Sequence, residues 1–378
     1  MAMEKIMKNS IPVYKPDINF LEKRNVNQCL KSSWISSTGL FIKKFEDSFK
    51  NFTSIKYCTT VSNGTVALHL AMLALEISSD DEVIVPTFTY IASVNCISYV
   101  GAKPVFVDSC IDTLQVDIND LKKKINKKTK AIIIPHLYGN ITNMDKILSL
   151  KKKYNIFLIE DCAEAVGTFY NNNHAGTFGD ISTFSFFGSK TITTGEGGMV
   201  CSNNKNLIDK VIKFKGQGLS VKKNKKYYWH DVIGYNYRMT NICAAIGCAQ
   251  IKKINKILLK KKKIFQLYNK YLFNQPVSFI KSEKNSINSY WLVVILLKNY
   301  KKKKNLIDFL RQKNIDTRNT FYPIHSMPMY KRFRKKSNFV NAELISKSGV
   351  CLPSYSTLKK TDIIKISDQI KIFFRNEK

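Results

Sequence analysis

Five short polar segments of the sequence each follow an apolar run, and their residues are of types that bind and activate small molecules. If the apolar runs are parallel strands, these segments meet at one edge of a sheet, where α/β proteins bind their ligands. The segments therefore define a candidate site. They are residues 62–65 (Ser-Asn-Gly-Thr), 86–90 (Pro-Thr-Phe-Thr-Tyr), 136–139 (His-Leu-Tyr-Gly), 160–164 (Glu-Asp-Cys-Ala-Glu) and 185–190 (Ser-Phe-Phe-Gly-Ser-Lys).

Asp161 closes a strongly apolar run at residues 156–159, a position where a buried carboxylate needs a cationic or hydrogen-bonding partner. A protonated pyridine nitrogen is one such partner. In the chemistry of pyridoxal phosphate (PLP), an aspartate at this nitrogen keeps the ring cationic, so that the ring accepts electrons from a substrate carbanion. An aspartate at a strand end is also an ordinary helix cap, and Asp161 alone does not decide between the two.

Lys190 follows a predicted strand and precedes a small, glycine-rich run at residues 193–198. Glycines allow such a loop to turn sharply, which could direct the lysine amine inward. A lysine amine that is partly removed from water can form a Schiff base with an aldehyde and then move protons. In so basic a chain, an exposed position is the simpler interpretation for any one lysine. Lys190 stands out because of its neighbours Ser185 and Gly188 and the order of the other segments.

Gly64 and Thr65 lie where a predicted strand turns into a helix. The backbone N–H groups at a helix start can bind a phosphate, and the helix dipole favours its negative charge. Glycine and threonine are also ordinary residues at helix starts, so the pair alone supports both a phosphate site and a plain cap.

The alternation of apolar runs with helical patterns from residue 57 to about residue 200 predicts an α/β fold with a parallel sheet covered by helices. Strands are expected at residues 57–61, 82–85, 104–108, 131–136, 156–161, 183–187 and 198–202. Helices are expected at residues 65–75, 90–100, 118–125 and 144–154. A helical stretch at 241–271, a strand at 290–297 and helices at 305–313 and 361–374 predict a smaller α+β domain. We therefore expect a large domain at residues 1–255 and a smaller one at 256–378.

The formal net charge of +33 is a feature shared with many nucleic-acid-binding proteins. Only seven of the 61 basic residues are arginines, however, and arginine is the usual residue for bidentate contacts with phosphate and guanine. The lysines instead lie in short runs, such as residues 260–263 and 301–304, which are typical of a solvated surface. Such a surface favours an anionic substrate without requiring nucleic acid.

The nine cysteines include no C-x-x-C pair, which indicates reduced thiols rather than a disulfide frame or a zinc site. Cys243 and Cys248 come closest to a metal-binding pair, but no histidine or second cysteine pair completes it. The longest apolar run, residues 291–297, is too short to cross a bilayer, and the first nine residues lack the apolar core of a secretory signal. We expect a cytoplasmic protein with no metal and no membrane span.

Taken together, these segments resemble the DegT/DnrJ/EryC1/StrS sugar aminotransferases. The similarity runs along nearly the whole chain, through residues 11–13, 62–68, 160–165, 195–199 and 325–328. It implies the fold-type I architecture of PLP-dependent aminotransferases, with a large domain built on a mixed, mostly parallel sheet and a smaller α+β C-terminal domain. Residues 87–94, 191–199 and 228–240 are most similar to members that make GDP-perosamine.

The resemblance also implies roles for individual residues. Lys190 would bond covalently to PLP, and Asp161 would pair with its ring nitrogen. Gly64, Thr65 and Ser185 would hold the phosphate group.

Three further roles are implied around the cofactor ring and at a subunit interface. Tyr90 would stack on the ring face, and Glu164, where many relatives have glutamine, would lie near the ring hydroxyl. Asn236 would reach the cofactor phosphate of the neighbouring subunit, so that a homodimer would form shared active sites. Less directly, five residues would lie on the sugar-nucleotide side: His136, Trp229, His230, Arg238 and His325.

The implied reaction is PLP-dependent transfer of an amino group from L-glutamate to C4 of GDP-4-keto-6-deoxy-D-mannose, giving GDP-perosamine for bacterial surface polysaccharide (O-antigen). The same chemistry on a UDP- or dTDP-linked keto sugar is the alternative, because a few pocket residues could redirect a relative. A non-catalytic scaffold would be expected to lack Lys190 or Asp161, and both are present. A nucleic-acid-binding protein would be expected to have arginine-rich clusters with aromatic residues, which only residues 330–334 suggest.

Overall fold

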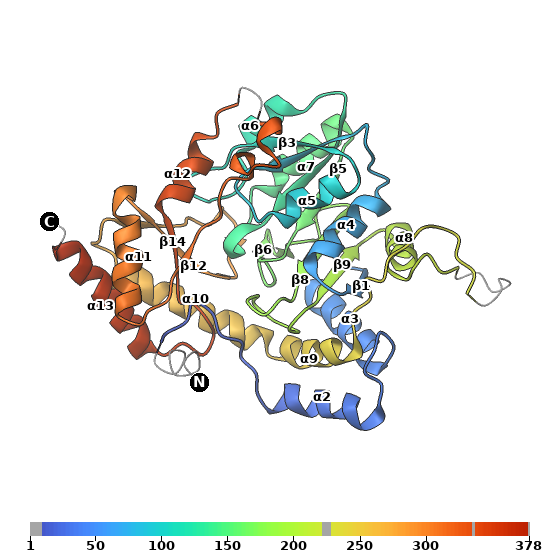
Figure 1. The fold of residues 1–378 in the computed structure, drawn as a ribbon, viewed down its shortest axis with the longest axis horizontal. Helices are drawn as coiled ribbons and strands as arrows, with labels where there is room; N and C mark the ends of the chain where they lie inside the picture. Colours follow the sequence, from blue (N-terminus) through green and yellow to red (C-terminus); the bar gives the residue numbers. More distant parts are fainter. Residues whose placement is uncertain (1–9, 221–227, 335–336, 377–378) are drawn as a thin grey trace.

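A computed structural model describes residues 10–220, 228–334 and 337–376, and Figure 1 shows the path of the chain. At its centre is a seven-stranded sheet in the order β1-β9-β8-β5-β4-β2-β3. All seven strands begin and end within two residues of the ranges expected from the sequence. In sheet order they are Tyr57–Val61, Gly198–Ser202, Ile181–Ser185, Phe157–Asp161, Thr129–Pro135, Glu82–Pro86 and Lys103–Val107.

The central sheet is mixed but mostly parallel, which confirms the expected fold class. β2 is parallel to β3 and β4, β4 is parallel to β5, and β5 is parallel to β8. Only β9 opposes its neighbours, β8 and β1, so β1 runs in the same direction as β8. The carboxyl ends of β1, β2, β4, β5 and β8 therefore lie at one edge, where the five polar segments follow them.

Both faces of this sheet are buried, which explains why its strands carry apolar residues on both faces. Successive residues of a strand point to opposite faces. On β4, Ile133 packs into the cluster that includes α4 (Gly64–Ala74), whereas Ile132 packs into the cluster that includes α7 (Met144–Tyr154). Other helices of this half of the chain are α2 (Phe20–Ser32), α3 (Leu40–Thr53), α5 (Ala92–Tyr99), α6 (Ile118–Lys124), α8 (Lys205–Lys215) and α9 (Asn241–Lys252).

The C-terminal part of the chain forms a second, antiparallel sheet with its own helices, seen in orange and red in Figure 1. Its strands, in sheet order, are β10 (Val277–Phe279), β12 (Val293–Leu297), β14 (Gly349–Leu352) and β13 (Arg318–Asn319). Its helices are α10 (Ile254–Tyr271), α11 (Lys303–Gln312), α12 (Val340–Ser348) and α13 (Lys360–Asn376). This arrangement agrees with a smaller α+β unit.

Segments from the two predicted domains nevertheless pair with each other. Ile11 forms a β-bridge with Ile315 near the C-terminal sheet. A third, small sheet pairs β11 (Ser286–Ile287) with β6 (Phe169–Tyr170), which in turn pairs with β7 (Asn173–His174). The domain boundary at residues 255 and 256 therefore stays a prediction.

The predicted extents of two elements in the C-terminal half are wrong. The stretch at 241–271 is not one helix, because Lys253 leaves the helical conformation and separates α9 from α10. Lys253 instead forms an ion pair with the buried Glu22, at 2.8 Å. The strand expected from residue 290 begins only at Val293, since Tyr290 takes the left-handed conformation with φ 51°. The apolar pattern of the sequence predicts neither the helix end at Lys253 nor the late start of β12.

All nine cysteines lie in the described residues and are free thiols. Within the same described ranges, no helix is both long enough and apolar enough to cross a membrane.

Phe49→Ala is expected to lower the free energy of unfolding by about 3–5 kcal/mol, because it removes a large side chain from a packed core. Phe49 is buried, and its ring lies 4.9 Å from that of Phe184 and 5.5 Å from that of Phe186. Urea unfolding followed by circular dichroism measures the loss. Phe20→Ala is the matched control because Phe20 is 72% exposed. Equal losses in the two variants would contradict this packing.

Candidate active site

A cavity of about 580 Å³ opens where the parallel strands end, and all five polar segments contribute to it. The segments meet because strands that are neighbours in the sheet end at the same edge. Eight of the predicted site residues line this cavity: Gly64, Thr65, Tyr90, His136, Asp161, Glu164, Ser185 and Lys190. Their individual roles stay predictions.

Asp161 ends β5 with a buried, hydrogen-bonded carboxylate. The hydroxyl of Ser93 on α5 donates to one oxygen at 2.6 Å, and the backbone N–H of Ala163 donates to the other at 3.1 Å. The side chain also lines the cavity. These bonds fix the carboxylate in orientation, and its negative charge suits a cationic group of a ligand.

Lys190 and Glu164 form a charged pair inside the cavity. The lysine Nζ lies 3.6 Å from Glu164 Oε1, and both side chains are largely buried. The backbone N–H of Tyr138 donates to Glu164 Oε2 at 2.8 Å. Burial raises the pKa of Glu164 to about 7, although the Lys190 ammonium opposes this shift. Glu164 therefore changes its protonation near neutral pH, next to the lysine amine.

Gly64 begins α4, and its lack of a side chain allows β8 to approach the helix start. A Cβ at Gly64 would lie 2.8 Å from Ser185 Cβ and 3.2 Å from Ser185 Oγ. Asn63 caps the helix by accepting a hydrogen bond from the N–H of Val66 at 3.0 Å. The start of this helix and the hydroxyl groups of Thr65 and Ser185 together form a site suited to a phosphate.

Aromatic side chains form one wall of the cavity. Tyr90 is 57% exposed, and its ring lies 5.8 Å from that of Phe321. Phe321 stacks on Tyr138, which stacks on Trp291 at a ring distance of 5.9 Å. Tyr90, Phe321 and Trp291 line the cavity, whereas the buried Tyr138 packs between Phe321 and Trp291 without lining it. We call these four residues the aromatic wall. It offers ring faces against which a planar ligand can pack.

Four residues at the site were not expected from the sequence: Ser93, Trp291, Arg318 and Phe321. Ser93 lies in the segment 87–94, whose similarity to the family was a usable signal. The other three come from the C-terminal half and line the cavity only through tertiary packing. No motif or spacing marks them.

Four other predicted residues, Trp229, His230, Asn236 and Arg238, do not line the Lys190 cavity. All four are exposed. His230 Nδ1 lies 2.8 Å from the carbonyl oxygen of Gln217, and Asn236 forms a β-bridge with Gly216. Within one chain, the structure therefore does not bring these residues to Lys190.

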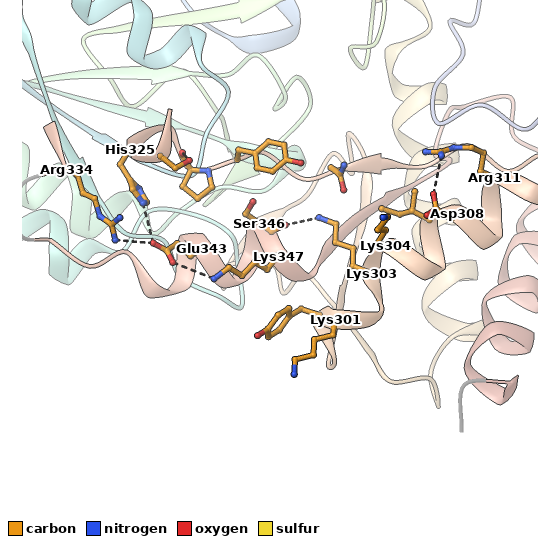
Figure 2. A pocket seen from close by; sticks show the side chains of 16 residues that line it. Lys301, Lys303, Lys304, Asp308, Arg311, His325, Arg334, Glu343, Ser346 and Lys347 are labelled. Atoms are coloured by element: carbon orange, nitrogen blue, oxygen red, sulfur yellow. Dashed lines mark hydrogen bonds and ion pairs between the residues drawn. The ribbon is translucent and has the colours of Figure 1, made fainter. Parts of the chain in front are cut away.

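His325 lies beside a different groove, of about 760 Å³, which Figure 2 shows between α11 and α12. Its Nδ1 lies 2.8 Å from Thr87 Oγ1, and its Nε2 lies 3.4 Å from Glu343 Oε1. Burial lowers the pKa of His325, and the nearby Arg334 lowers it further. His325 thus joins the end of β2 to α12, and its predicted contact with the substrate stays a prediction.

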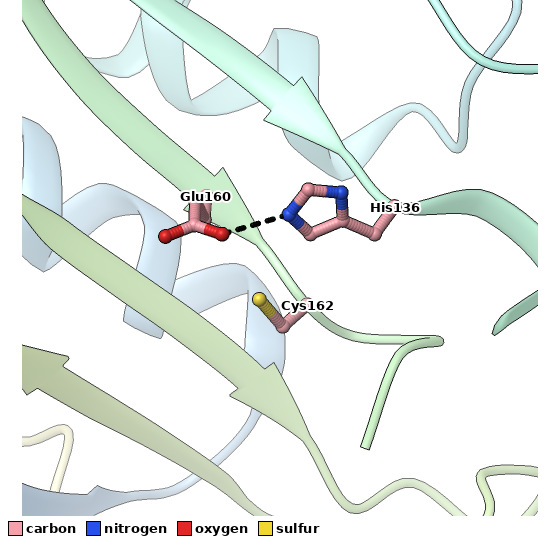
Figure 3. Close-up of side chains that lie close together, drawn as sticks. All are labelled: His136, Glu160 and Cys162. Carbon is pink, nitrogen blue, oxygen red and sulfur yellow. Dashed lines mark hydrogen bonds and ion pairs between the residues drawn. The ribbon is translucent and has the colours of Figure 1, made fainter. Parts of the chain in front are cut away.

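His136, Glu160 and Cys162 lie close enough together to be considered as metal ligands, as Figure 3 shows. Glu160 accepts hydrogen bonds from three backbone N–H groups at 2.6–2.8 Å, as well as contacting His136 Nε2 at 2.9 Å. Burial raises the pKa of the Cys162 thiol well above its usual value. Because metal ligands must be deprotonated and available, the arrangement is better explained as a hydrogen-bonded His–Glu pair.

The charges and the shape of the cavity fit PLP. The helix start at Gly64 suits its phosphate, Asp161 suits a protonated ring nitrogen, and Lys190 provides a buried amine for its aldehyde. Within the described part of the chain, the buried Nδ1 of His136 also has no hydrogen-bond partner, so a bound ligand could supply one. The fold and this set of groups define a PLP-dependent aminotransferase.

Comparison with known proteins gives the family. The chain matches the DegT/DnrJ/EryC1/StrS aminotransferase family over residues 16–371, and it belongs to that family. A protein of Escherichia coli O157:H7 named GDP-perosamine synthase is 52% identical, covering 97% of this chain and 99% of its own. A Vibrio cholerae protein of the same name is 47% identical, covering 96% of this chain and 99% of its own. The PLP form of a putative sugar aminotransferase, Spr1654 from Streptococcus pneumoniae, superposes with a TM-score of 0.90 at 26% identity, covering 97% and 99%.

Glu164→Gln is expected to make stability less sensitive to pH. Because the folded-state pKa of Glu164 is raised to about 7, its contribution to stability is present below about pH 4.5 and is lost as the pH rises through 7. Glutamine does not titrate, so the variant should lose roughly 2 kcal/mol less than wild type between pH 5 and pH 8. Thermal unfolding at both pH values measures this. Substitution of the exposed Asp80 by asparagine is the control, and an unchanged pH slope in Glu164→Gln would count against the assignment.

Proposed function

We propose that this protein transfers an amino group from L-glutamate to C4 of GDP-4-keto-6-deoxy-D-mannose, giving GDP-perosamine for surface polysaccharide. The two relatives named GDP-perosamine synthase, at 52% and 47% identity over nearly the whole chain, support this choice of substrate. The observation that carries the proposal is the meeting of Lys190, Asp161 and Glu164 in one cavity. Amino transfer needs a lysine amine and a carboxylate partner for the ring nitrogen.

Each cavity residue has a proposed task. When bound, PLP supplies an electron sink for the carbanion formed at the donor carbon. Asp161 would hold a proton on the ring nitrogen, while Gly64, Thr65 and Ser185 would bind the phosphate. Lys190 would hold the cofactor covalently at rest. Once freed, its Nζ would take the proton from the α-carbon of L-glutamate. In the second half, which reverses the first, the same Nζ would deliver a proton to C4 of the sugar.

Other residues would orient the ring and the sugar nucleotide. Tyr90 would cover the ring face, and Glu164 would lie near the ring hydroxyl. The substrate carries a diphosphate, so Arg318 at the cavity wall and the net charge of +33 would favour its approach. His136 and His325 are proposed to lie on the sugar-nucleotide side of the site.

The proposed enzyme is a homodimer with shared active sites. Trp229, His230, Asn236 and Arg238 are exposed and do not line the cavity of their own chain, although Tyr237 between them does. The segment that contains them exposes apolar surface, including Ile233, which is 87% exposed. A second copy of the chain would cover this surface. Asn236 of the first copy would then reach the cofactor phosphate of the second copy and complete the second copy's site.

We also propose that the enzyme acts in the cytoplasm. Nine free cysteines are characteristic of a reducing compartment, since oxidising compartments favour disulfides.

The absorbance spectrum tests the cofactor, the donor and the acceptor together. Wild-type protein with PLP is expected to show a visible band that bleaches with L-glutamate and returns with GDP-4-keto-6-deoxy-D-mannose. Lys190→Ala is expected to lack the band and the transfer but to keep the fold, measured by circular dichroism. Return of the band only with a UDP- or dTDP-linked keto sugar would overturn the substrate, and normal turnover by Lys190→Ala would overturn the mechanism.

Mixing inactive variants tests the shared site. In a mixed dimer of Lys190→Ala and Asn236→Ala chains, one site keeps both wild-type residues, so activity should recover to roughly a quarter of wild type. A mixture of Lys190→Ala and Asp161→Ala is the control, because both residues belong to one chain's cavity and no intact site can form. Recovery in the control, or none in the first mixture, would contradict the proposed arrangement.

A further inference from the structure

The loop that carries Lys190 is held by two aromatic residues from distant parts of the chain. The hydroxyl of Tyr14 donates to the carbonyl oxygen of Lys190. The indole Nε1–H of Trp291 donates to the carbonyl oxygen of Ser189 at 2.7 Å. Two successive carbonyl groups at the lysine are therefore fixed by side chains from the N-terminal segment and from the segment before β12.

Trp291 makes a second contact with the same lysine. Lys190 Nζ lies 4.4 Å from the centroid of the Trp291 ring, within the distance at which an indole face attracts a cation. Trp291 is 3% exposed and the Lys190 side chain is 13% exposed, so water screens this attraction little. The charged amine therefore contacts both the carboxylate of Glu164 and the face of Trp291.

The position of Trp291 is itself fixed by a buried lysine. Lys261 on α10 donates to the carbonyl oxygen of Trp291 at 2.9 Å and to that of Ser354 at 2.7 Å. Burial lowers the pKa of Lys261 to about 7, as expected for an amine surrounded by protein. From the other side, Gly139 (φ +83°) allows close approach, because a Cβ there would lie 2.8 Å from the backbone nitrogen of Trp291.

We propose that Trp291 is a positioning residue for Lys190. Its N–H group holds the loop at Ser189, and its ring face stabilises the charged form of the free amine. The two contacts act at different stages: the N–H group would hold the loop throughout, whereas a free ammonium can lie over the ring only when Lys190 is not bonded to the cofactor. This inference rests on the proposed function, since it requires Lys190 to carry PLP.

Two substitutions separate the two contacts. Trp291→Phe keeps an aromatic face but loses the N–H donor, whereas Trp291→Leu loses both. Trp291→Phe also keeps most of the buried volume, so a folded protein is expected. Phe321→Leu is the matched control, because it removes another ring that lines the cavity, and in the described structure the Phe321 ring contacts Phe88, Tyr90 and Tyr138 rather than the Lys190 amine.

The ring contact is tested on the holoenzyme after reaction with L-glutamate, when the Lys190 amine is free. Acylation of Lys190 by a small reagent at neutral pH, followed by peptide mass spectrometry, measures how much of the amine is uncharged. Trp291→Leu is expected to react about fivefold faster than wild type, and Trp291→Phe within about twofold of it. Phe321→Leu should match wild type.

The N–H contact is tested by the rate at which PLP leaves the holoenzyme. Both Trp291 variants are expected to release it about fivefold faster, because one buried hydrogen bond at the loop is lost.

If both Trp291 variants match wild type in acylation and in release, the inference is wrong. If Phe321→Leu changes acylation as much as Trp291→Leu, the ring acts only as packing and the positioning role is also overturned. Failure of the proposed function is distinct from both results: wild-type protein itself would then form no PLP band, or L-glutamate would not free Lys190.

Discussion

The site depends on keeping a lysine amine and a carboxylate together at positions where both side chains are largely buried. Removing two charges from water is unfavourable unless they pair closely and their remaining hydrogen-bonding groups are satisfied. Lys190 and Glu164 lie 3.6 Å apart, with the N–H of Tyr138 on the carboxylate, and this pairing offsets only part of the cost, since burial still raises the pKa of Glu164 to about 7. The surrounding chain must hold both groups in place, and much of the architecture serves that need.

The central sheet supplies most of this support, but not all of it. Strand ends place Asp161, Glu164 and Gly64 at one edge because six of the seven strands point the same way. The remaining wall comes from the C-terminal half, through Trp291 and Phe321. The site therefore forms only when the two halves of the chain pack together. Residues far from it in sequence support it: Tyr14 donates to the carbonyl oxygen of Lys190, and Lys261 donates to that of Trp291.

The sequence predicts those parts of the site that depend on local features, and it does not predict those that depend on tertiary contacts. Strand ends are local features, so Asp161 and Lys190 were identifiable from an apolar run followed by a reactive residue. The break at Lys253 and the left-handed Tyr290 were not, because burial of Lys253 and the approach of Gly139 are set by tertiary contacts. Trp291 and Arg318 belong to no motif and reach the cavity only through folding. Asn236 does not line the cavity of its own chain, although its neighbour Tyr237 does, so its proposed role depends on a second copy of the chain.

The central claim is that Lys190, among 61 basic residues of which only seven are arginines, is the one that bonds to PLP. Borohydride reduction of the PLP-loaded protein makes such a bond permanent, and peptide mass spectrometry then locates it. The account predicts one modified lysine per chain, at position 190, and loss of that modification when L-glutamate is added first. Modification of another lysine, or a scatter over many surface lysines with none at Lys190, would contradict it.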